Sequence, residues 1–184
     1  MGESLRLIIE LDQVLAAKEG DRASLEKLLE AVWPHAFRIA QSILRNETAA
    51  EDAAQEACVA VFRTISTLRS PDAFPAWFYR LVVRQAMSDY KQLPAPVPNP
   101  ATIGDPTDSH ALGIDVRAAL DALPLGQRTT LILFHYAGLT SKEIGAVMGV
   151  PPPTVRFRLA QARRSMRKLL DRGDYTRSTR EALS

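Results

Sequence analysis

Apolar residues recur at spacings of three and four along most of the chain, the spacing that gives a helix one apolar face. Residues 5–18 and 24–44 both follow this pattern, and a Gly-Asp pair interrupts it between them. Arg45 ends the second stretch, and a third begins near Thr48. The chain is therefore predicted to be all-α.

The third stretch has one face of small residues and one acidic face. The small face, suited to close helix packing, consists of Ala49, Ala53, Ala57, Ala60 and Val61. The acidic face consists of Glu51, Asp52, Gln55 and Glu56. Asp52 and Glu56 are four residues apart, where like charges repel mildly. Such a cluster is usually a solvated surface, and its functional alternative is a docking site for a partner helix that carries arginine.

A loop at residues 69–72 leads into a helix that is rich in aromatic residues and runs through Lys91. Its predicted core residues are Trp77, Phe78, Leu81 and Val82, and its predicted outward residues are Arg80, Arg84, Gln85, Ser88 and Lys91. Aromatic rings beside arginines can stack on exposed bases, as in proteins that hold single-stranded DNA. A core role is the simpler interpretation of Trp77 and Phe78. Tyr79 and the arginines are thus the better DNA candidates.

Residues 93–113 have the composition of a linker. Five of the 12 prolines lie in this segment, and no helical period survives there. Proline makes a linker extended and semi-rigid. It is predicted to tether two small helical domains, residues 1–92 and 114–172, and residues 173–184 are expected to form a loose tail.

The second domain contains the pattern of a helix-turn-helix. Thr140 and Glu143 are spaced as a capping box at the start of a short amphipathic helix. Gly149 suits the turn, and proline is favoured at the first position of a helix. The next helix is therefore predicted to begin near Pro152 or Pro153.

This second helix is densely basic. From residue 153 to residue 172 it carries seven arginine or lysine residues and one acid, Asp171. Its predicted buried side consists of Val155, Leu159, Ala162, Met166, Leu169 and Leu170, and its outward side of Arg156, Phe157, Ala160, Gln161 and Arg164. A basic run alone would indicate a solvated face. Following a capped helix and a glycine turn, it indicates a recognition helix that enters the DNA major groove.

Composition and charge agree with a DNA-binding role for the second domain. The 184 residues are 46% hydrophobic and 24% charged, which is ordinary for a globular protein. The net charge of +2 conceals −2 on residues 1–92 and +6 on residues 114–172. Such polarity suggests that one half meets nucleic acid and the other half meets a different partner.

The sequence argues against several other classes of protein. A single cysteine, Cys58, excludes an internal disulfide and is expected to be a buried thiol. No signal peptide or membrane-spanning run is present, so a cytoplasmic protein is expected. His35, His110 and His135 are scattered, and no catalytic or metal-binding constellation appears. We therefore expect neither an enzyme nor a bound cofactor.

Three segments in this order resemble the extracytoplasmic-function (ECF) sigma factors, the small two-domain initiation subunits of bacterial RNA polymerase. TAAEDAAQEACVAVFR (residues 48–63) resembles the helix that docks on the polymerase. FPAWFYRLVVRQAMSDYK (residues 74–91) resembles the helix that handles the melted minus-ten element. Residues 119–170 resemble the domain that reads the minus-thirty-five element. The resemblance covers residues 11–170 and implies core polymerase, promoter DNA and an anti-sigma factor as partners.

The resemblance also implies roles for individual residues. The polymerase clamp helices would be contacted by Glu51, Asp52, Gln55 and Glu56. The minus-ten element would be contacted by Arg69, Ser70, Asp72, Tyr79, Arg80, Arg84 and Gln85, with residues 69–72 capturing a flipped base. The minus-thirty-five element would be contacted by Thr154, Arg156, Phe157, Arg158, Gln161, Arg163 and Arg164.

Departures from the family affect the promoter sequence rather than the fold. The family usually has glycine at the position of Pro153, serine at that of Phe157, and a bulkier or basic residue at that of Gln161. In the minus-ten helix, Gln85 stands where asparagine is common. Phe157 can rest against thymine methyl groups, which serine does less well.

Two other functions fit parts of the pattern. A sigma mimic that titrates an anti-sigma factor would need no basic recognition helix. A stand-alone helix-turn-helix regulator would leave the acidic helix and the aromatic-arginine helix without a purpose, and the chain shows no heptad seam for dimerisation.

Overall fold

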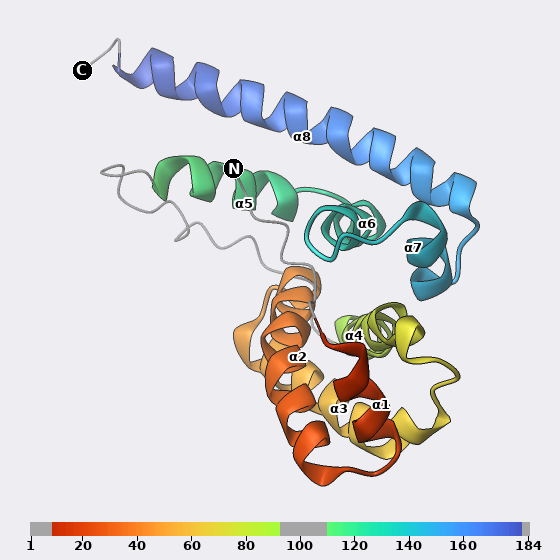
Figure 1. Ribbon diagram of the computed structural model, residues 1–184. Coiled ribbons are helices and arrows are strands. Elements are labelled where there is room, and N and C mark those ends of the chain that lie inside the picture. The colour runs from red at the N-terminus through yellow and green to blue at the C-terminus, as the bar shows by residue number, and fades with distance from the viewer. Residues whose placement is uncertain (1–8, 93–109, 182–184) are drawn as a thin grey trace.

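The computed structural model describes residues 9–92 and 110–181. For residues 110–115 and 172–181 it describes the backbone alone. All regular structure in these ranges is helical, as expected (Figure 1). The α-helices are α1 (Leu11–Lys18), α2 (Arg22–Leu44), α3 (Glu47–Thr64), α4 (Phe74–Tyr90), α5 (His110–Asp121), α6 (Leu125–His135), α7 (Ser141–Met148) and α8 (Pro152–Glu181). Two short 3-10 turns, η1 (Ile65–Thr67) and η2 (Pro71–Ala73), connect α3 to α4.

Helices α1 to α4 form the N-terminal half, in which α2 packs against the other three. Side chains cap two of these helices, because Asp21 accepts a hydrogen bond from the Ser24 amide at 2.8 Å and Asn46 accepts one from the Ala49 amide at 2.9 Å. The small face of α3 is buried, as predicted, through Ala50, Ala53, Ala54, Ala57 and Val61. Small side chains allow α3 to lie close to α2, and this leaves the acidic side of α3 in solvent.

Helices α5 to α8 form the C-terminal half, with α6 and α7 packed against the first turns of α8. The predicted capping box is present: the Thr140 amide donates to Glu143 at 2.7 Å, and the Glu143 amide donates to the Thr140 hydroxyl at 3.3 Å. Gly149 has φ = 66°, the left-handed conformation that ends α7, and α8 begins at Pro152. The helix-turn-helix is confirmed.

The ends of three elements differ from the sequence-based boundaries. Helix α1 begins at Leu11, since residues 9 and 10 are not helical, and residues 5–8 lie outside the described part. Helix α5 begins at residue 110, inside the segment assigned to the linker, whereas residues 93–109 lie outside the described part. Helix α8 continues to residue 181, so the backbone of residues 173–181 is helical and not a loose tail.

Gly145 of α7 has a packing role that can be tested. A Cβ atom on it would lie 2.7 Å from the carbonyl oxygen of Val150, inside the turn. We expect Gly145→Ala to lower the free energy of unfolding by about 1–3 kcal/mol, the usual cost of overpacking, although alanine favours helices. Gly126→Ala is the matched control, because its Cβ would meet only the movable Arg158 side chain, at 3.4 Å. Equal stability of both variants in urea titrations would contradict this role.

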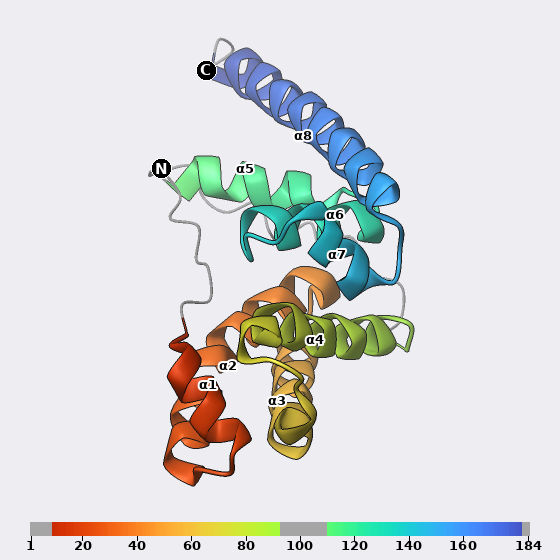
Figure 2. The ribbon, with the colours of Figure 1, turned by 45° about the vertical axis from the view of Figure 1, so that its right-hand side comes forward.

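The two halves are packed against each other. Helix α2 contacts α6, and α4 contacts α7, which lies directly above it in Figure 2. Buried apolar residues of both halves, from Val14 in α1 to Ala162 in α8, form one continuous cluster. The composition of the linker predicts independently folded halves on an extended tether, and in this structure the halves instead share an interface.

Candidate nucleic-acid interface and acidic docking face

Helix α8 presents a basic outer face because its apolar face is used for packing. Val155, Leu159 and Ala162 are buried, which turns Arg156, Phe157, Ala160 and Arg164 into solvent. The Phe157 side chain is 61% exposed. The second helix of the helix-turn-helix thus offers unobstructed arginine and aromatic side chains, as a major groove reader requires.

Three other predicted recognition residues rest on α6 in this structure. The Arg163 guanidinium lies 5.1 Å from the centre of the Phe134 ring. The Gln127 amide donates to the Gln161 side-chain oxygen at 3.1 Å, and Arg158 extends across Gly126. Thr154 is half-buried near the start of the helix. Arg158 and Gln161 are thus half-buried against α6, whereas Arg163 is exposed together with Arg156, Phe157 and Arg164.

The candidate minus-ten residues lie on α4 and in the turn before it. Arg69, Asp72, Arg80 and Arg84 are exposed, and the Ser70 hydroxyl donates to the Asp72 carboxylate at 3.3 Å. Gln85 is half-buried, and its amide donates to both oxygens of Asp89 at 3.1 and 3.2 Å. Asp89 thus competes with a DNA base for the amide of Gln85.

Tyr79 is not the exposed DNA contact that the sequence predicts. Its side chain is 0% exposed, and burial raises the pKa of its hydroxyl group. The reason is a second apolar stripe on α4, in which Tyr79, Val83 and Ala86 are buried at helical spacing. Phe78 is buried as predicted and Trp77 is half-buried, so all three aromatic residues serve packing here.

The acidic face on α3 is solvated along its length. Glu51, Asp52, Gln55 and Glu56 are all exposed, and none of the three carboxylates forms a salt bridge with another residue in the described part. Asp52 and Glu56 also line a shallow groove with Gln85 and Asp89 of α4. The carboxylates are therefore available to a basic partner.

Phe62 extends this face and was not singled out from the sequence. It lies two turns after Gln55 on α3, and its side chain is 62% exposed. A large apolar residue on the polar side of an amphipathic helix is the sequence pattern that identifies Phe62 as a contact residue. Phe62 offers an apolar contact beside the carboxylates, a combination that is typical of protein interfaces.

Cys58 and His35 are half-buried, and burial shifts the pKa of each. Burial raises the pKa of the Cys58 thiol to about 11, so the half-buried thiol stays protonated at neutral pH. Burial, and next the charge of Arg38, lower the pKa of His35. In residues 9–92 and 110–181, no three potential ligands come together as a metal site, and no helix there is long and apolar enough to cross a membrane.

Sequence comparisons identify both halves. Residues 28–93 match the family model of sigma-70 region 2, and residues 114–166 match that of sigma-70 region 4. The RNA polymerase sigma factor SigV of Bacillus subtilis is 32% identical, over 76% of this chain and 87% of SigV. The ECF RNA polymerase sigma factor SigE of Mycolicibacterium smegmatis is 34% identical, over 82% of this chain. The chain spans 64% of the length of SigE.

Structural comparisons give the same fold. CnrH, solved in complex with the cytosolic domain of CnrY, aligns with a TM-score of 0.67 at 23% identity, over 88% of this chain and 98% of CnrH. The sigma factor RpoE of Bartonella quintana, solved in complex with the anti-sigma factor NepR, aligns with a TM-score of 0.64 at 20% identity, over 79% of this chain and 96% of RpoE.

Proposed function

Because this chain belongs to the ECF sigma factors of bacterial RNA polymerase, we propose that it directs core polymerase to specific promoters and assists DNA melting at initiation. The observation that carries the proposal is the separation of two free surfaces of opposite charge. Acidic side chains are exposed on α3, and arginines are exposed on α8. One chain can thus bind a basic protein surface and DNA at the same time.

Within this proposal the N-terminal half meets polymerase and melted DNA, and the C-terminal half meets double-stranded DNA. Residues 1–92 dock on polymerase through Glu51, Asp52, Gln55 and Glu56 and hold the melted minus-ten strand through Arg80 and Arg84. The turn at residues 69–72 receives a flipped base. Residues 114–172 read the double-stranded minus-thirty-five element with Arg156, Phe157 and Gln161. Thr154, Arg158, Arg163 and Arg164 contribute phosphate contacts or further base contacts.

Other parts of the proposal follow from the family. An anti-sigma factor is a partner, since the compared RpoE was solved with one. The activity takes place in the bacterial cytoplasm, where the polymerase and the chromosome lie. Phosphodiester bond formation belongs to core polymerase, so the chain itself is not an enzyme and needs no cofactor.

The exposed arginines of α8 disfavour the sigma mimic, and the free carboxylates of α3 disfavour the stand-alone regulator. A sigma mimic has no use for the solvated Arg156 and Arg164. A stand-alone regulator has no use for the free carboxylates of α3. The test is a band-shift assay on promoter-like DNA with an unpaired minus-ten region. The complex of chain and core polymerase should retain this DNA with sequence preference, whereas core polymerase alone should not. A chain that binds duplex DNA specifically but never joins core polymerase would be a stand-alone regulator.

A further inference from the structure

The outer face of α8 contains an apolar patch between arginines. Phe157 and Ala160 lie three residues apart and are both exposed, whereas the other apolar residues between Val155 and Leu170 are buried or half-buried. Arg156 and Arg164 border the patch. An exposed phenylalanine gains by leaving water, and its basic neighbours favour a polyanion as the surface that covers it. Its place on the second helix of a helix-turn-helix favours the major groove of DNA.

The major groove has one apolar group on its base edges, the C5 methyl of thymine. We propose that the patch formed by Phe157 and Ala160 determines specificity by packing on thymine methyl groups of the upstream promoter element. This inference rests on the proposed function and names what the recognition helix reads. Arg156 and Arg164 flank the patch and contact guanine or phosphate beside the thymines.

The test removes a single methyl group from the DNA. A duplex is first selected from a random-sequence library with the chain assembled on core polymerase, and each thymine of the upstream element is then replaced by deoxyuracil. At one or two positions the replacement should lower the affinity for DNA about fourfold, which corresponds to the free energy of burying one methyl group. Phe157→Ala should lose affinity on the thymine duplex and become indifferent to the replacement. Val116→Ala, which truncates an exposed apolar residue of α5, should keep the methyl sensitivity.

Either of two results would overturn the inference. The unaltered chain could bind every uracil duplex as tightly as the thymine duplex, or Phe157→Ala could lose as much affinity on a uracil duplex as the unaltered chain does. If no sequence is selected at all, the proposed function itself fails. Binding to core polymerase with sequence selection but without methyl sensitivity refutes only the thymine contact.

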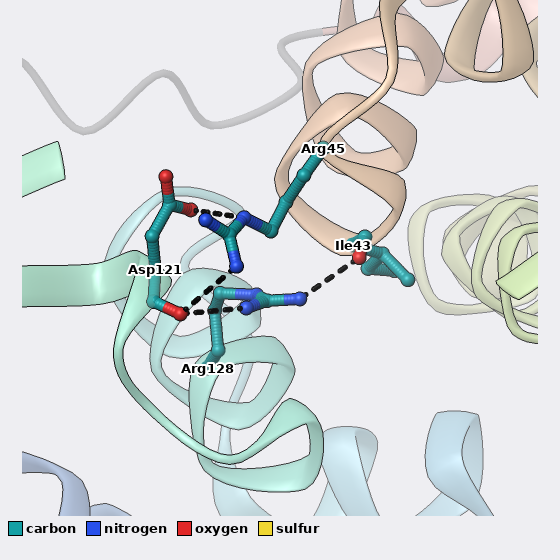
Figure 3. Close-up of polar contacts among 4 residues, drawn as sticks. All are labelled: Ile43, Arg45, Asp121 and Arg128. Carbon is teal, nitrogen blue, oxygen red and sulfur yellow. Dashed lines mark hydrogen bonds and ion pairs between the residues drawn. The ribbon is translucent and has the colours of Figure 1, made fainter. Parts of the chain in front are cut away.

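A second inference concerns the polar contacts that join the two halves (Figure 3). The Arg128 guanidinium of α6 is 3% exposed and donates to the carbonyl oxygen of Ile43 on α2 at 2.9 Å. The Arg45 side chain pairs with the Asp121 carboxylate at 3.1 Å and donates to the Asp121 carbonyl oxygen at 3.2 Å. We call these four residues the latch.

Arg45 is held in an unfavourable backbone conformation. Its φ of 59° is the only positive value among non-glycine residues of the described part. Helices that end in this conformation normally have glycine or asparagine there. At this residue the strained backbone ends α2 and allows a long cationic side chain to reach the other half. Strain of this kind is typically retained where a specific contact depends on it.

The contact between halves limits which DNA the chain can bind. The minus-ten and minus-thirty-five elements are about 25 base pairs apart, roughly 85 Å at 3.4 Å per base pair. In this structure α4, which carries the candidate minus-ten residues, touches α7 of the helix-turn-helix. The closed chain therefore cannot place its halves on both elements, while the carboxylates of α3 remain free.

We infer that the latch, the Arg45–Asp121 pair together with the Arg128–Ile43 hydrogen bond, is the set of contacts that holds the two halves of the free chain together. The Arg45 and Asp121 side chains are 31% and 30% exposed, so water competes for their ion pair. This part of the latch can therefore give way when a partner binds.

The test measures the distance between the halves by energy transfer. Fluorophores are attached to cysteines introduced at the exposed positions Thr67 and Lys168, with Cys58→Ala removing the native thiol. Arg45→Asp suits the left-handed cap, because aspartate tolerates positive φ, but it repels Asp121. Arg45→Asp and Asp121→Arg should each lower transfer efficiency, and the double variant should restore it. Arg22→Asp is the control, because Arg22 pairs with Glu26 within α2.

Low transfer in the unaltered chain, or failure of the double variant to restore it, would overturn the latch. Thermal melts of every variant, followed by circular dichroism, distinguish opening of the contact between the halves from unfolding of the chain. Addition of core polymerase should also lower transfer efficiency. A latch that is confirmed in the free chain but stays closed when core polymerase and promoter DNA are both bound would refute the opening step and leave the latch of the free chain standing.

Discussion

Changing Asp52 and Glu56 together to lysine is expected to abolish co-purification of this sigma factor with core RNA polymerase. Both carboxylates are exposed on α3 and form no salt bridge in the described part of the chain. Reversal of their charge replaces attraction to a basic surface by repulsion, and like charges across an interface cost several kcal/mol, so affinity should fall about 100-fold or more. Pull-down of tagged core polymerase measures the effect.

The control for this variant reverses two carboxylates elsewhere in the same half. Glu19 and Glu30 are also exposed, and Glu19→Lys with Glu30→Lys alters the net charge by the same amount. This control should still co-purify with polymerase. Because the changed side chains are solvated and the alanine face of α3 is untouched, both variants should melt close to the unaltered chain. Equal capture of both variants would refute the docking face.

Arg156→Ala is expected to weaken binding to the preferred minus-thirty-five element and to relax selectivity at one base pair. Arg156 is exposed in the first turns of α8, where base edges are within reach of a recognition helix. A bidentate contact to guanine is worth about 1–3 kcal/mol of discrimination, whereas a phosphate contact is nearly blind to sequence. Titration of matched and mismatched duplexes at several salt concentrations separates these roles.

Lys168→Ala is the comparison for Arg156→Ala, since Lys168 is exposed three turns further along α8. It should lower affinity for all sequences modestly and reduce the salt dependence by about one charge. If Arg156→Ala loses the same affinity on every duplex, Arg156 is a phosphate contact and the reading face of α8 has been misassigned.

Features set by local chemistry could be predicted from the sequence. The helix-turn-helix depends on Thr140, Glu143 and Gly149, whose capping and turn preferences act over a few residues. The buried and exposed sides of α8 follow from its helical period. The acidic face of α3 follows from the alanines on its opposite side, because a helix this closely packed has only one side left for solvent.

Features that depend on the contact between halves could not be predicted. Tyr79 is buried because α4 packs against other helices on two sides. The residue pattern of α4 does not predict which helix packs on its second apolar stripe. Arg128 is a buried cation of α6, and its partner Ile43 is 85 residues away in the chain. The side-chain positions of Arg158, Gln161 and Arg163 likewise depend on contacts with α6.

The most direct test of the sigma function is run-off transcription with purified bacterial core polymerase on a genomic promoter library. If the chain is an initiation factor, adding it should produce transcripts from a restricted set of promoters that share an upstream and a downstream element. Core polymerase alone, or core polymerase with the Asp52→Lys, Glu56→Lys variant, should produce none of them. Identical transcripts with and without the unaltered chain, at concentrations that saturate binding, would contradict the account.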